Sequence, residues 1–518
     1  MAESTTPASS TASGQSTDEP TQAAQQPSIG WRHPPLLFEV GRPGRIGVQL
    51  EESGVDERPL SELLPEELIR PSVEGLPEVS EVDVLRHFTR LSRRNYTPDL
   101  GLYPLGSCTM KYNPRINEEV ARLRGFGDSH PLQPEATVQG NLELLWELEQ
   151  ALIRLTGLER VSLQPAAGAQ GELTGIALVR AALEARGEER KTVLIPDSAH
   201  GTNPASARFA GFEVRELLSN EHGTLDLEDL ERSMNEDVAA LMLTVPNTLG
   251  VFEDQILDIA RIVHSKGAFL YCDGANFNAF VGKVLPGDMG VDVLHMNLHK
   301  TFTTPHGGGG PGSGPVAAGP ELAPFLPVPM VEKREDGTFY QDFDRAQSIG
   351  RVRSFHGQFG MAVRALAYIW AMGGEGLAQV AENAVLNANY VRRGLEGKYH
   401  MPYVGPSMHE VVFSDKTQQA NGVSTLDIAK RLMDYGFHPP TVYFPTIVSG
   451  ALLIEPTETV AQEDLDSFID AMRSIADEAE NHPELVKGAP YTTPVRRCDE
   501  KRAARQPILA WAPARDQE

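Results

Sequence analysis

Short apolar runs alternate with amphipathic helical patterns between about residues 160 and 300. Each run is short enough to be a buried strand. The runs cover residues 192–196, 212–217, 238–245, 268–272 and 291–296. Between the third and fourth runs, apolar residues recur at i, i+3, i+4 and i+7 from Ile256 to Val263, and Gly267 ends this helix. The alternation predicts an α/β fold with a mostly parallel sheet covered by helices.

The rest of the chain divides into segments of different composition. Residues 1–30 hold mainly Ser, Thr, Ala, Gln and Pro, which predicts a disordered tail. Residues 31–125 are dense in Pro and Gly with short helical patches, and we expect an N-terminal arm that lies over another surface. Residues 126–375 are predicted to form the large, cofactor-binding domain. Residues 376–518 are predicted to form a small α+β domain with a C-terminal extension.

The predicted small domain follows a long helical pattern. This pattern runs from Phe359 to about Leu395, and Gly373 and Gly374 interrupt it. Further strand-like and helical runs follow it. They are the strand-like residues 409–413, 441–447 and 451–454 and the helical residues 462–476.

Charge and cysteine content exclude several classes of protein. With 71 Asp and Glu against 46 Lys and Arg, the net charge of −25 repels polyanions, so we expect no broad binding to nucleic acid or anionic membrane. The 3 cysteines lie far apart without a CxxC pair, which disfavours a disulfide framework or a thiolate metal site. No apolar window reaches the roughly 20 residues of a membrane span, and no targeting segment is evident. We therefore expect a cytoplasmic protein. A local basic segment, residues 491–505, could dock a partner or pair within the chain.

The most informative segment follows the last predicted strand. It reads His-Met-Asn-Leu-His-Lys-Thr-Phe-Thr-Thr-Pro-His from His295 to His306 and continues into four glycines. A lysine that leaves a strand end before a glycine-rich loop can form a Schiff base with an aldehyde cofactor whose phosphate needs close donors. Lys300 is therefore a candidate catalytic residue, with pyridoxal phosphate as the candidate cofactor. A lysine before such a loop is also typical of an exposed surface.

Two other interpretations of this segment fit less well. A nucleotide phosphate loop places Gly-Lys-Ser/Thr after its glycines, whereas Lys300 precedes them. A metal site would use His295, His299 and His306. The first two histidines lack the intervening Glu of a zinc motif, and a strand would splay them. We therefore predict no metal site.

Asp273 ends the predicted strand that precedes this segment. A buried carboxylate needs a partner, and the pyridine nitrogen of the cofactor would supply one. An ionised Asp273 would keep that nitrogen protonated and make the ring an electron sink. An Asp at a strand end can also cap a helix. Together, Asp273 and Lys300 favour the cofactor interpretation.

Other strand ends carry weaker candidates. Gly168, Ala169 and Gln170 lie in a turn of small residues before a helical pattern, where backbone amides could bind a phosphate. His200 follows another strand, so its imidazole could stack on a flat ring or could serve as a cap. Possible donors to a phenolic oxygen follow two further strands: Asn247 and Asn276.

In chain order, a phosphate turn, a ring-stacking residue, an Asn, an Asp and a Lys at successive strand ends resemble pyridoxal-phosphate enzymes of the aspartate aminotransferase fold, called fold type I. Four longer motifs are similar to a narrower family, the P-protein of the glycine cleavage system. They are Ser-Cys-Thr-Met-Lys-Tyr-Asn-Pro-Arg at 107–115, Asp-Ser-Ala-His-Gly-Thr-Asn-Pro-Ala at 197–205, Asn-Leu-His-Lys-Thr-Phe at 297–302 and Thr-Thr-Pro-Val-Arg-Arg at 492–497. The resemblance runs from about residue 34 to 511, and it is to the second chain of the two-chain form.

The resemblance implies a role for individual residues. Lys300 corresponds to the lysine that holds pyridoxal phosphate, Asp273 to the partner of the ring nitrogen, and His200 to the ring-stacking position. Further candidate positions around the cofactor are Ala169, Gln170, Asn297 and His299.

The reaction that this resemblance implies is the decarboxylation of glycine with transfer of the aminomethyl group to the lipoyl arm of H-protein and release of CO2. The lipoyl disulfide is then the oxidant. The implied partners are lipoylated H-protein and a separate glycine dehydrogenase subunit 1, in a heterotetramer with two copies of each subunit. A tight arginine would stabilise the glycine carboxylate more than the nearly neutral CO2 that forms, so we expect neutral donors there, with Arg351 and Arg353 only as neighbours.

Two other functions stay open. The chain could be a cofactor-free structural subunit, although Asp273 and Lys300 disfavour this. It could also be another fold type I enzyme, an aminotransferase or a cysteine desulfurase. A desulfurase needs a mobile catalytic cysteine, and Cys272 is badly placed because it adjoins Asp273 in a predicted buried strand.

Overall fold

The computed structural model describes residues 35–71, 75–130, 132–353 and 357–510. The chain divides into two compact units, residues 1–95 and residues 96–518. This boundary falls inside the segment 31–125 that the sequence indicates as one arm, so residues 96–125 belong to the larger unit. The predicted tail, residues 1–30, lies outside the described residues.

The first unit contains short helices. They are α1 (Leu37–Val40), α2 (Leu60–Leu63) and α3 (Glu81–Ser92). Helix α3 begins with a capping box. The Ser80 hydroxyl accepts a hydrogen bond from the N–H of Asp83, and the Asp83 carboxylate accepts one from the N–H of Ser80.

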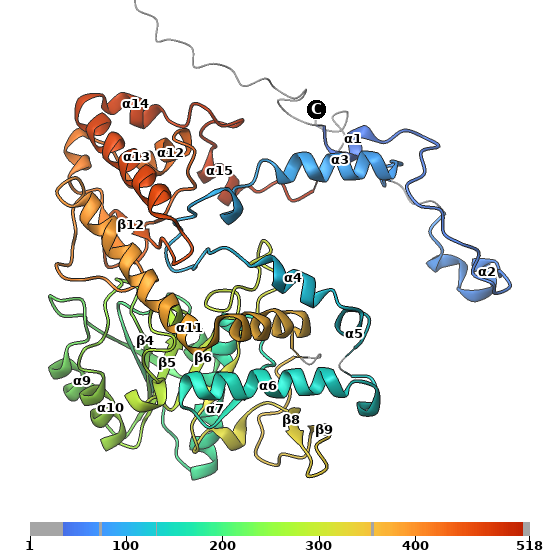
Figure 1. Cartoon of the computed structure of the whole chain (residues 1–518), viewed down its shortest axis with the longest axis horizontal. Coiled ribbons are helices and arrows are strands. Elements are labelled where there is room, and N and C mark those ends of the chain that lie inside the picture. Colours follow the sequence, from blue (N-terminus) through green and yellow to red (C-terminus); the bar gives the residue numbers. More distant parts are fainter. Residues whose placement is uncertain (1–34, 72–74, 131, 354–356, 511–518) are drawn as a thin grey trace, which may run out of the picture. The chain divides into compact units, whose positions relative to one another are not determined.

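A seven-stranded sheet organises the second unit, in the order β1-β7-β6-β5-β4-β2-β3 (Figure 1). Strands β2 to β6 are parallel, whereas β7 runs antiparallel to β6 and β1. The strands are β1 (Arg160–Ser162), β2 (Thr192–Pro196), β3 (Glu213–Leu217), β4 (Val238–Thr244), β5 (Phe269–Gly274), β6 (Val293–Met296) and β7 (Val316–Ala318). The five predicted strands and the mostly parallel sheet are confirmed.

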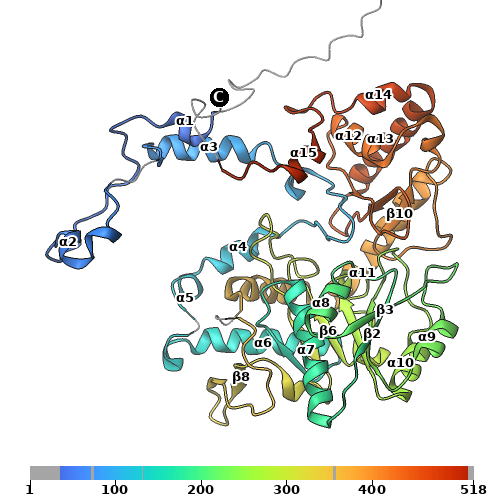
Figure 2. The same cartoon turned by 180° about the vertical axis from the view of Figure 1, so that it is seen from behind.

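Helices cover both faces of this sheet (Figures 1 and 2). Along β4, Leu241 and Leu243 point into one apolar core and Met242 into the other, because successive side chains of a strand alternate between its faces. The first core is shared with α6 (Gln139–Thr156), α9 (Leu227–Ser233), α10 (Ile256–Ser265) and α11 (Phe359–Leu395), and the second with α7 (Gly168–Arg186) and α8 (Asn203–Phe209). The sheet is therefore buried on both faces.

Helix α11 is interrupted where the sequence predicts it. Gly373 has φ 62° and ψ −178°, a conformation that a side chain would strain. Helix α10 ends as predicted, since Gly267, directly after the C-cap residue Lys266, has φ 70°.

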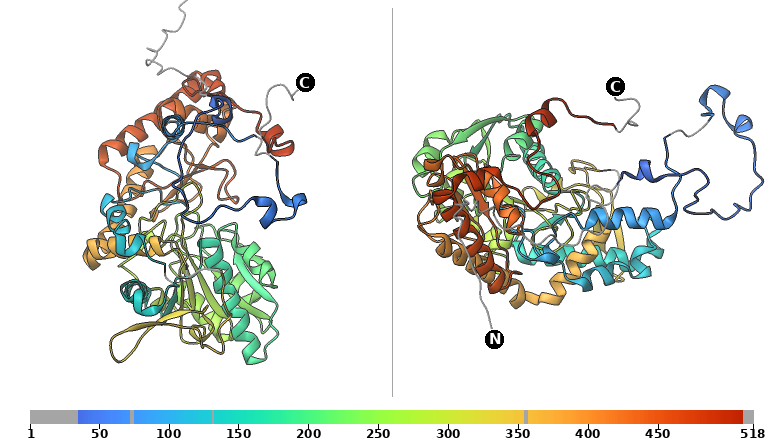
Figure 3. Two further views of the ribbon diagram at one scale, coloured as in Figure 1. Left: turned by 90° about the vertical axis from the view of Figure 1, so that its right-hand side faces the viewer. Right: turned by 90° about the horizontal axis from the view of Figure 1, so that it is seen from above.

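A smaller antiparallel sheet, in the order β10-β12-β11, follows α11 and has an apolar core of its own with the C-terminal helices (Figure 3). The strands of this sheet are β10 (Val411–Ser414), β11 (Thr441–Val442) and β12 (Ala451–Ile454), and the helices are α12 (Thr425–Asp434), α13 (Gln462–Asn481) and α14 (Pro483–Gly488). The predicted strand 441–447 is wrong beyond Val442, because Tyr443 adopts φ 58°, which ends the extended backbone. The domain boundary at residue 375 stays a prediction.

The remaining α-helices and strands are short. They are α4 (Arg115–Ala121), α5 (Arg124–Gly127), β8 (Met330–Lys333), β9 (Phe339–Asp342) and α15 (Glu500–Arg505). Among the described residues, no helix is both long enough and apolar enough to cross a lipid bilayer.

Candidate active site

Three predicted residues meet at the carboxyl edge of the large sheet. Asp273 lies at the end of β5, His200 follows β2, and Lys300 follows β6. Parallel strands end at the same edge, which is where ligands bind in open α/β sheets. A carboxylate oxygen of Asp273 and a ring nitrogen of His200 lie within 4.8 Å of each other and of the Glu172 carboxylate. Burial and then the nearby Lys300 amine lower the pKa of His200, against the opposing effect of Asp273.

Asp273 is completely buried and is held as an anion by two hydrogen-bond donors and a histidine. Its Oδ1 accepts from the Ala275 N–H at 2.9 Å and faces His295 Nε2 at 3.2 Å, and its Oδ2 accepts from Asn203 Nδ2 at 2.9 Å. Burial alone would raise the pKa of the Asp273 carboxyl, but His295, His200 and these hydrogen bonds together lower it. The carboxylate therefore keeps its charge in an apolar strand.

His295 is a direct neighbour of Asp273 across the sheet, since the two residues are paired in the β5–β6 register. Its Nδ1 lies 2.8 Å from the Tyr271 hydroxyl, so the ring is fixed from both sides. We interpret His295 as a support for Asp273 in the candidate site.

Glu172 supports the same site from α7. Its carboxylate accepts hydrogen bonds from the Thr202 hydroxyl at 2.6 Å and from Asn203 Nδ2 at 2.9 Å. Because Asn203 also donates to Asp273, the Glu172 carboxylate orients the donor that holds Asp273. The His200 Nδ1 lies 2.8 Å from the same Thr202 hydroxyl. One buried network therefore connects the candidate ring-stacking residue to the candidate acid.

Lys300 is 8% exposed, and its Nζ donates to the backbone carbonyl of Ser107 at 2.9 Å. The segment around Ser107 is fastened to two buried carboxylates of the small sheet region. Ser107 N–H donates to Glu410 at 2.7 Å, and Thr109 N–H donates to Glu455 at 2.8 Å. The sequence predicts no role for either glutamate.

The predicted phosphate turn lies at the start of α7, which begins at Gly168. A Cβ at Gly168 would lie 2.5 Å from Oδ1 of Asn297, so only glycine fits there. The Gln170 side chain accepts from the Ala166 N–H and donates to the Val352 carbonyl, so it shapes the turn. Ala169 leaves the first turn of the helix small. The backbone amides at a helix N-terminus are suited to bind a phosphate.

Several buried polar atoms of this region have no hydrogen-bond partner among the described residues. They are Oδ1 of Asn276, Oδ1 of Asn297 and Nε2 of His306. Unpaired buried polar atoms are costly, and a bound polar molecule would satisfy them. His299 is part of the same segment and accepts from the Ser313 N–H at 3.3 Å, while burial lowers its pKa to about 3. The lysine, the acid, the small-residue turn and these orphaned atoms together fit an aromatic aldehyde that carries a phosphate.

Three predicted candidates have bonds within the protein. The Asn247 amide nitrogen donates to the Gly223 carbonyl at 2.6 Å, and its oxygen accepts from two backbone N–H groups of its own loop. The Asn276 amide nitrogen donates to the Pro246 carbonyl at 2.8 Å. The Asn247 amide is therefore used within the protein, whereas the Asn276 amide retains an unpaired oxygen for a cofactor. In the basic segment, Arg497 pairs with Asp427 at 2.7 Å, so part of its charge is used within the chain.

Sequence reasoning missed three residues that complete this site and two glutamates that hold the segment beside it. Their signals were weak, since Asn203 lies only three positions after His200, and His295 was considered only as a metal ligand. The missed residues are Glu172, Asn203, His295, Glu410 and Glu455.

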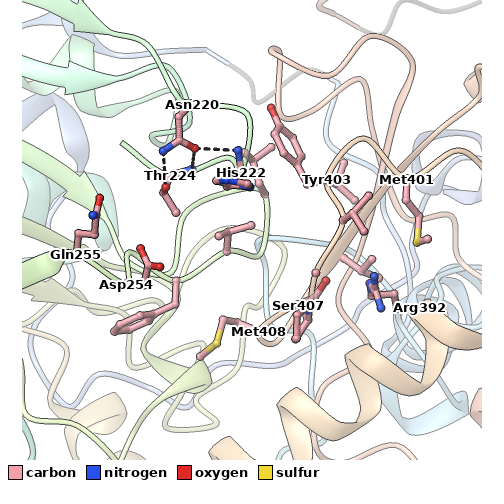
Figure 4. Close-up of a pocket in the computed structure, with 18 residues that line it drawn as sticks. Asn220, His222, Thr224, Asp254, Gln255, Arg392, Met401, Tyr403, Ser407 and Met408 are labelled. Carbon is pink, nitrogen blue, oxygen red and sulfur yellow. Dashed lines mark hydrogen bonds between the residues drawn. The ribbon is translucent and has the colours of Figure 1, made fainter. Parts of the chain in front are cut away.

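A cavity of about 470 Å³ lies elsewhere in the second unit (Figure 4). Residues that follow β3 and β4 line one side, and residues 401–408 with Arg392 of α11 line the other. Lys300, Asp273 and His200 do not line it. We therefore treat it as separate from the candidate active site.

Comparisons with known proteins agree with this geometry. The family described as "Glycine dehydrogenase, C-terminal domain" matches residues 380–489, and the family described as "Aminotransferase class-V" matches residues 170–309. A protein of Caldanaerobacter subterraneus subsp. tengcongensis named "Probable glycine dehydrogenase (decarboxylating) subunit 2" is 56% identical over 477 residues, which cover 92% of this chain and 98% of that protein. A protein of the same name from Bacillus velezensis is 58% identical over 477 residues, covering 92% and 97%.

Solved structures show the same fold at lower identity. A glycine decarboxylase (P-protein) of the glycine cleavage system, in inhibitor-bound form, superposes with a TM-score of 0.69 at 23% identity, over 80% of this chain and 94% of that chain. A cysteine desulfurase from Thermococcus onnurineus superposes with a TM-score of 0.58 at 15% identity, over 73% and 95%. These structures confirm the predicted fold type I architecture.

Proposed function

Because this chain belongs to the family of glycine dehydrogenase (decarboxylating) subunit 2, we propose that it decarboxylates glycine and passes the aminomethyl group to the lipoyl arm of H-protein. One observation carries the proposal: Lys300, Asp273 and His200 meet at one edge of the sheet, in a chain more than half identical to relatives of that name. The new bond joins the glycine Cα to one lipoyl sulfur as CO2 leaves. The other sulfur takes a proton, so the disulfide is reduced.

Pyridoxal phosphate is the cofactor that the site residues fit. When bound, it supplies an aldehyde that links to an amine and a ring that withdraws electrons from the Cα of an amino acid. Lys300 would provide the amine, and Gly168, Ala169 and Gln170 would hold the phosphate through the start of α7. Asn276, Asn297 and His299 would lie along the ring and phosphate.

The protein residues control charge in this site. Asp273, held by His295, Asn203 and a backbone N–H, can keep a positive charge on a ring nitrogen placed against it. His200 is kept neutral by burial, so it can pack against a flat ring without repelling a cation. These residues favour loss of a group, such as CO2, that leaves its bonding electrons on the Cα of the amino acid.

A desulfurase function is disfavoured by the two cysteines that lie near the candidate site. Burial raises the pKa of the Cys272 thiol strongly, and burial raises the pKa of the Cys108 thiol to about 11. The nucleophile in desulfurases is a thiolate, and neither side chain is one at neutral pH. Glycine decarboxylation is the function that the site supports best.

We propose that subunit 1 and lipoylated H-protein are the partners, in a heterotetramer of two copies of each subunit. The test is exchange of labelled bicarbonate into the carboxyl group of glycine by the purified chain, with and without subunit 1 and lipoylated H-protein. We expect exchange that depends on H-protein. Amino-group transfer to a keto acid in place of exchange would contradict the proposal.

A further inference from the structure

The segment Ser107–Thr109 has an unusual backbone that the proposed function does not explain. Ser107 has φ 62° and Thr109 has φ 49°, although neither is a glycine. This conformation is strained for a residue with a side chain and persists only where the surroundings hold it. This conformation points one carbonyl, that of Ser107, at the Lys300 amine.

Two buried glutamates hold this segment. Glu455 accepts from the Cys108 N–H at 3.1 Å, from the Thr109 N–H at 2.8 Å and from the Thr109 hydroxyl at 2.5 Å. Glu410 accepts from the Ser107 N–H at 2.7 Å, and its second oxygen has no partner. Both side chains have no exposed surface. Strain in the segment is therefore offset by bonds to carboxylates.

The two carboxyls differ in the number of donors that face them. Burial raises the pKa of both carboxyls, and the neighbouring Glu455 raises the pKa of Glu410 further. Three donors stabilise the ionised form of Glu455, whereas one donor serves Glu410. Of the two carboxyls, Glu455 is therefore the one whose surroundings favour the ionised form.

Several other titratable groups that interact with the Lys300 amine are neutral at pH 7. Burial lowers the pKa of His299 and of His409 to about 3, and burial raises the pKa of Cys108 to about 11. Burial also lowers the pKa of His200 and His306. The acid pair therefore supplies negative charge to this amine from the side of the 107–109 segment. The amine in turn lowers the pKa of both carboxyls, against the effect of burial.

We propose that Glu455, held as an anion by the Cys108–Thr109 turn, is the counter-charge of the free Lys300 amine, and that the Ser107 carbonyl is the rest position of this amine whenever it is not bonded to the cofactor. The inference rests on the proposed function, in which Lys300 must alternate between a bonded and a free amine. Glu455 is thus a positioning residue that acts through the 107–109 segment and its charge.

The test measures how fast the full-length chain, freed of cofactor, forms its covalent link with pyridoxal phosphate, followed by absorbance in a stopped-flow instrument. Only an unprotonated amine can form the link. Removal of a nearby opposite charge changes the proton affinity of an amine by about tenfold or more. Glu455→Gln is therefore expected to link about tenfold faster than wild type at pH 7. The difference is expected to shrink near pH 10, where an ordinary lysine amine also loses its proton.

Glu410→Gln is the matched control, because it keeps an oxygen for the Ser107 N–H and leaves the Glu455 charge in place. We expect its rate within about twofold of wild type. Thr109→Val is a second variant with nearly the same shape. It removes one of the three donors to Glu455 and should accelerate linking by a smaller factor than Glu455→Gln.

Equal rates for wild type and Glu455→Gln, or slower rates for the variant at both pH values, would overturn the inference, since the segment would then have only a structural role. Acceleration by Glu410→Gln as large as that by Glu455→Gln would overturn the assignment of the charge. A wild-type chain that forms no link at Lys300 would instead overturn the proposed function itself. If Glu455→Gln fails to fold, as judged by its thermal unfolding, a Thr109→Val rate equal to wild type overturns the inference.

Discussion

The carboxyl edge of the large sheet and the segment beside it are held together by different kinds of contact. At the sheet edge, Asp273, His200 and Lys300 follow strands of one sheet, and the fold brings them together. In what we call the seam, residues 105–112 pack against Glu410, Glu455 and Glu458, and hydrogen bonds join residues 303 to 347 positions apart. The order of the strands therefore determines where the reacting side chains lie. The charged side chains around them are placed by segments far away in the sequence.

Removal of the Lys300 amine is the strongest test of the sheet edge. In Lys300→Ala, no covalent link to pyridoxal phosphate can form, so we expect loss of the visible absorbance and a fall in bicarbonate exchange of about a thousandfold or more. Borohydride reduction of the wild-type chain followed by peptide mass spectrometry should locate the modified residue at Lys300. Lys416→Ala, a change at an exposed lysine, serves as the control and should keep both signals. A modified peptide that lacks Lys300 would contradict the assignment.

Asp273→Asn separates the charge of the acid from its place in the strand. Asparagine keeps the shape and can still bond to Asn203, but it cannot hold a positive charge on a ring nitrogen. We expect the cofactor to bind and the exchange activity to fall by about a thousandfold, roughly 4 kcal/mol of transition-state stabilisation. The measurement is the exchange rate beside the absorbance of the same sample. A variant with near wild-type exchange would remove Asp273 from the proposed chemistry.

The residues at the sheet edge could be predicted because their positions depend on short local sequence patterns. Each strand of β2 to β6 is a short apolar run, and the residue after it needs only the order of the strands to be placed at the carboxyl edge. Lys300, Asp273 and His200 were therefore found from the sequence. Asn203 and His295 were not, because their contacts with Asp273 depend on the β5–β6 register and on the start of α8.

The seam was closed to prediction for the opposite reason. Nothing local marks Glu455, which follows an ordinary strand, as the acceptor for the backbone of Cys108 and Thr109. The motif at 107–115 was noticed only through resemblance, and its left-handed residues carry no sequence signal because Ser and Thr usually avoid that conformation. Contacts across more than 300 positions are set by the whole fold.

The seam should also contribute strongly to stability. The Lys111 amine is buried, donates to Glu458 at 2.6 Å and to Asn278 Oδ1 at 2.8 Å, and lies 5.3 Å from the centre of the Tyr368 ring. Lys111→Met leaves the largely buried Glu458 carboxylate without its cationic partner and with only the Asn278 amide as a donor. We expect a loss of about 4 kcal/mol in the free energy of unfolding, measured by urea denaturation.

An exposed ion pair provides the control for this change. Arg124 and Asp128 are paired at 2.9 Å, but their side chains are 94% and 63% exposed. Arg124→Met should therefore change the free energy of unfolding by less than about 0.5 kcal/mol. If Lys111→Met unfolds at the same urea concentration as Arg124→Met, the seam does not hold the segment as described.

A carboxyl outside the seam shows whether burial raises the pKa of a carboxyl in this protein, as it does for Glu410 and Glu455 in the seam. Glu253, in the loop after β4, is 2% exposed and accepts from the Leu225 N–H at 3.0 Å. Burial raises its pKa to about 7. Between about pH 4.5 and 7 the folded chain keeps this proton while the unfolded chain has released it, so the unfolded state binds fewer protons and stability falls as the pH rises.

A shift of this size corresponds to about 3 kcal/mol across that window. The substituted side chain of Glu253→Gln cannot ionise. Between pH 4.5 and pH 7, the free energy of unfolding of this variant should therefore fall by about 3 kcal/mol less than that of wild type, as measured in paired urea titrations. The other titrating groups are common to both chains and cancel in the difference. Parallel curves for the two chains would mean that a buried carboxyl here ionises freely. Burial would then not by itself account for the raised pKa of Glu410 beside Lys300.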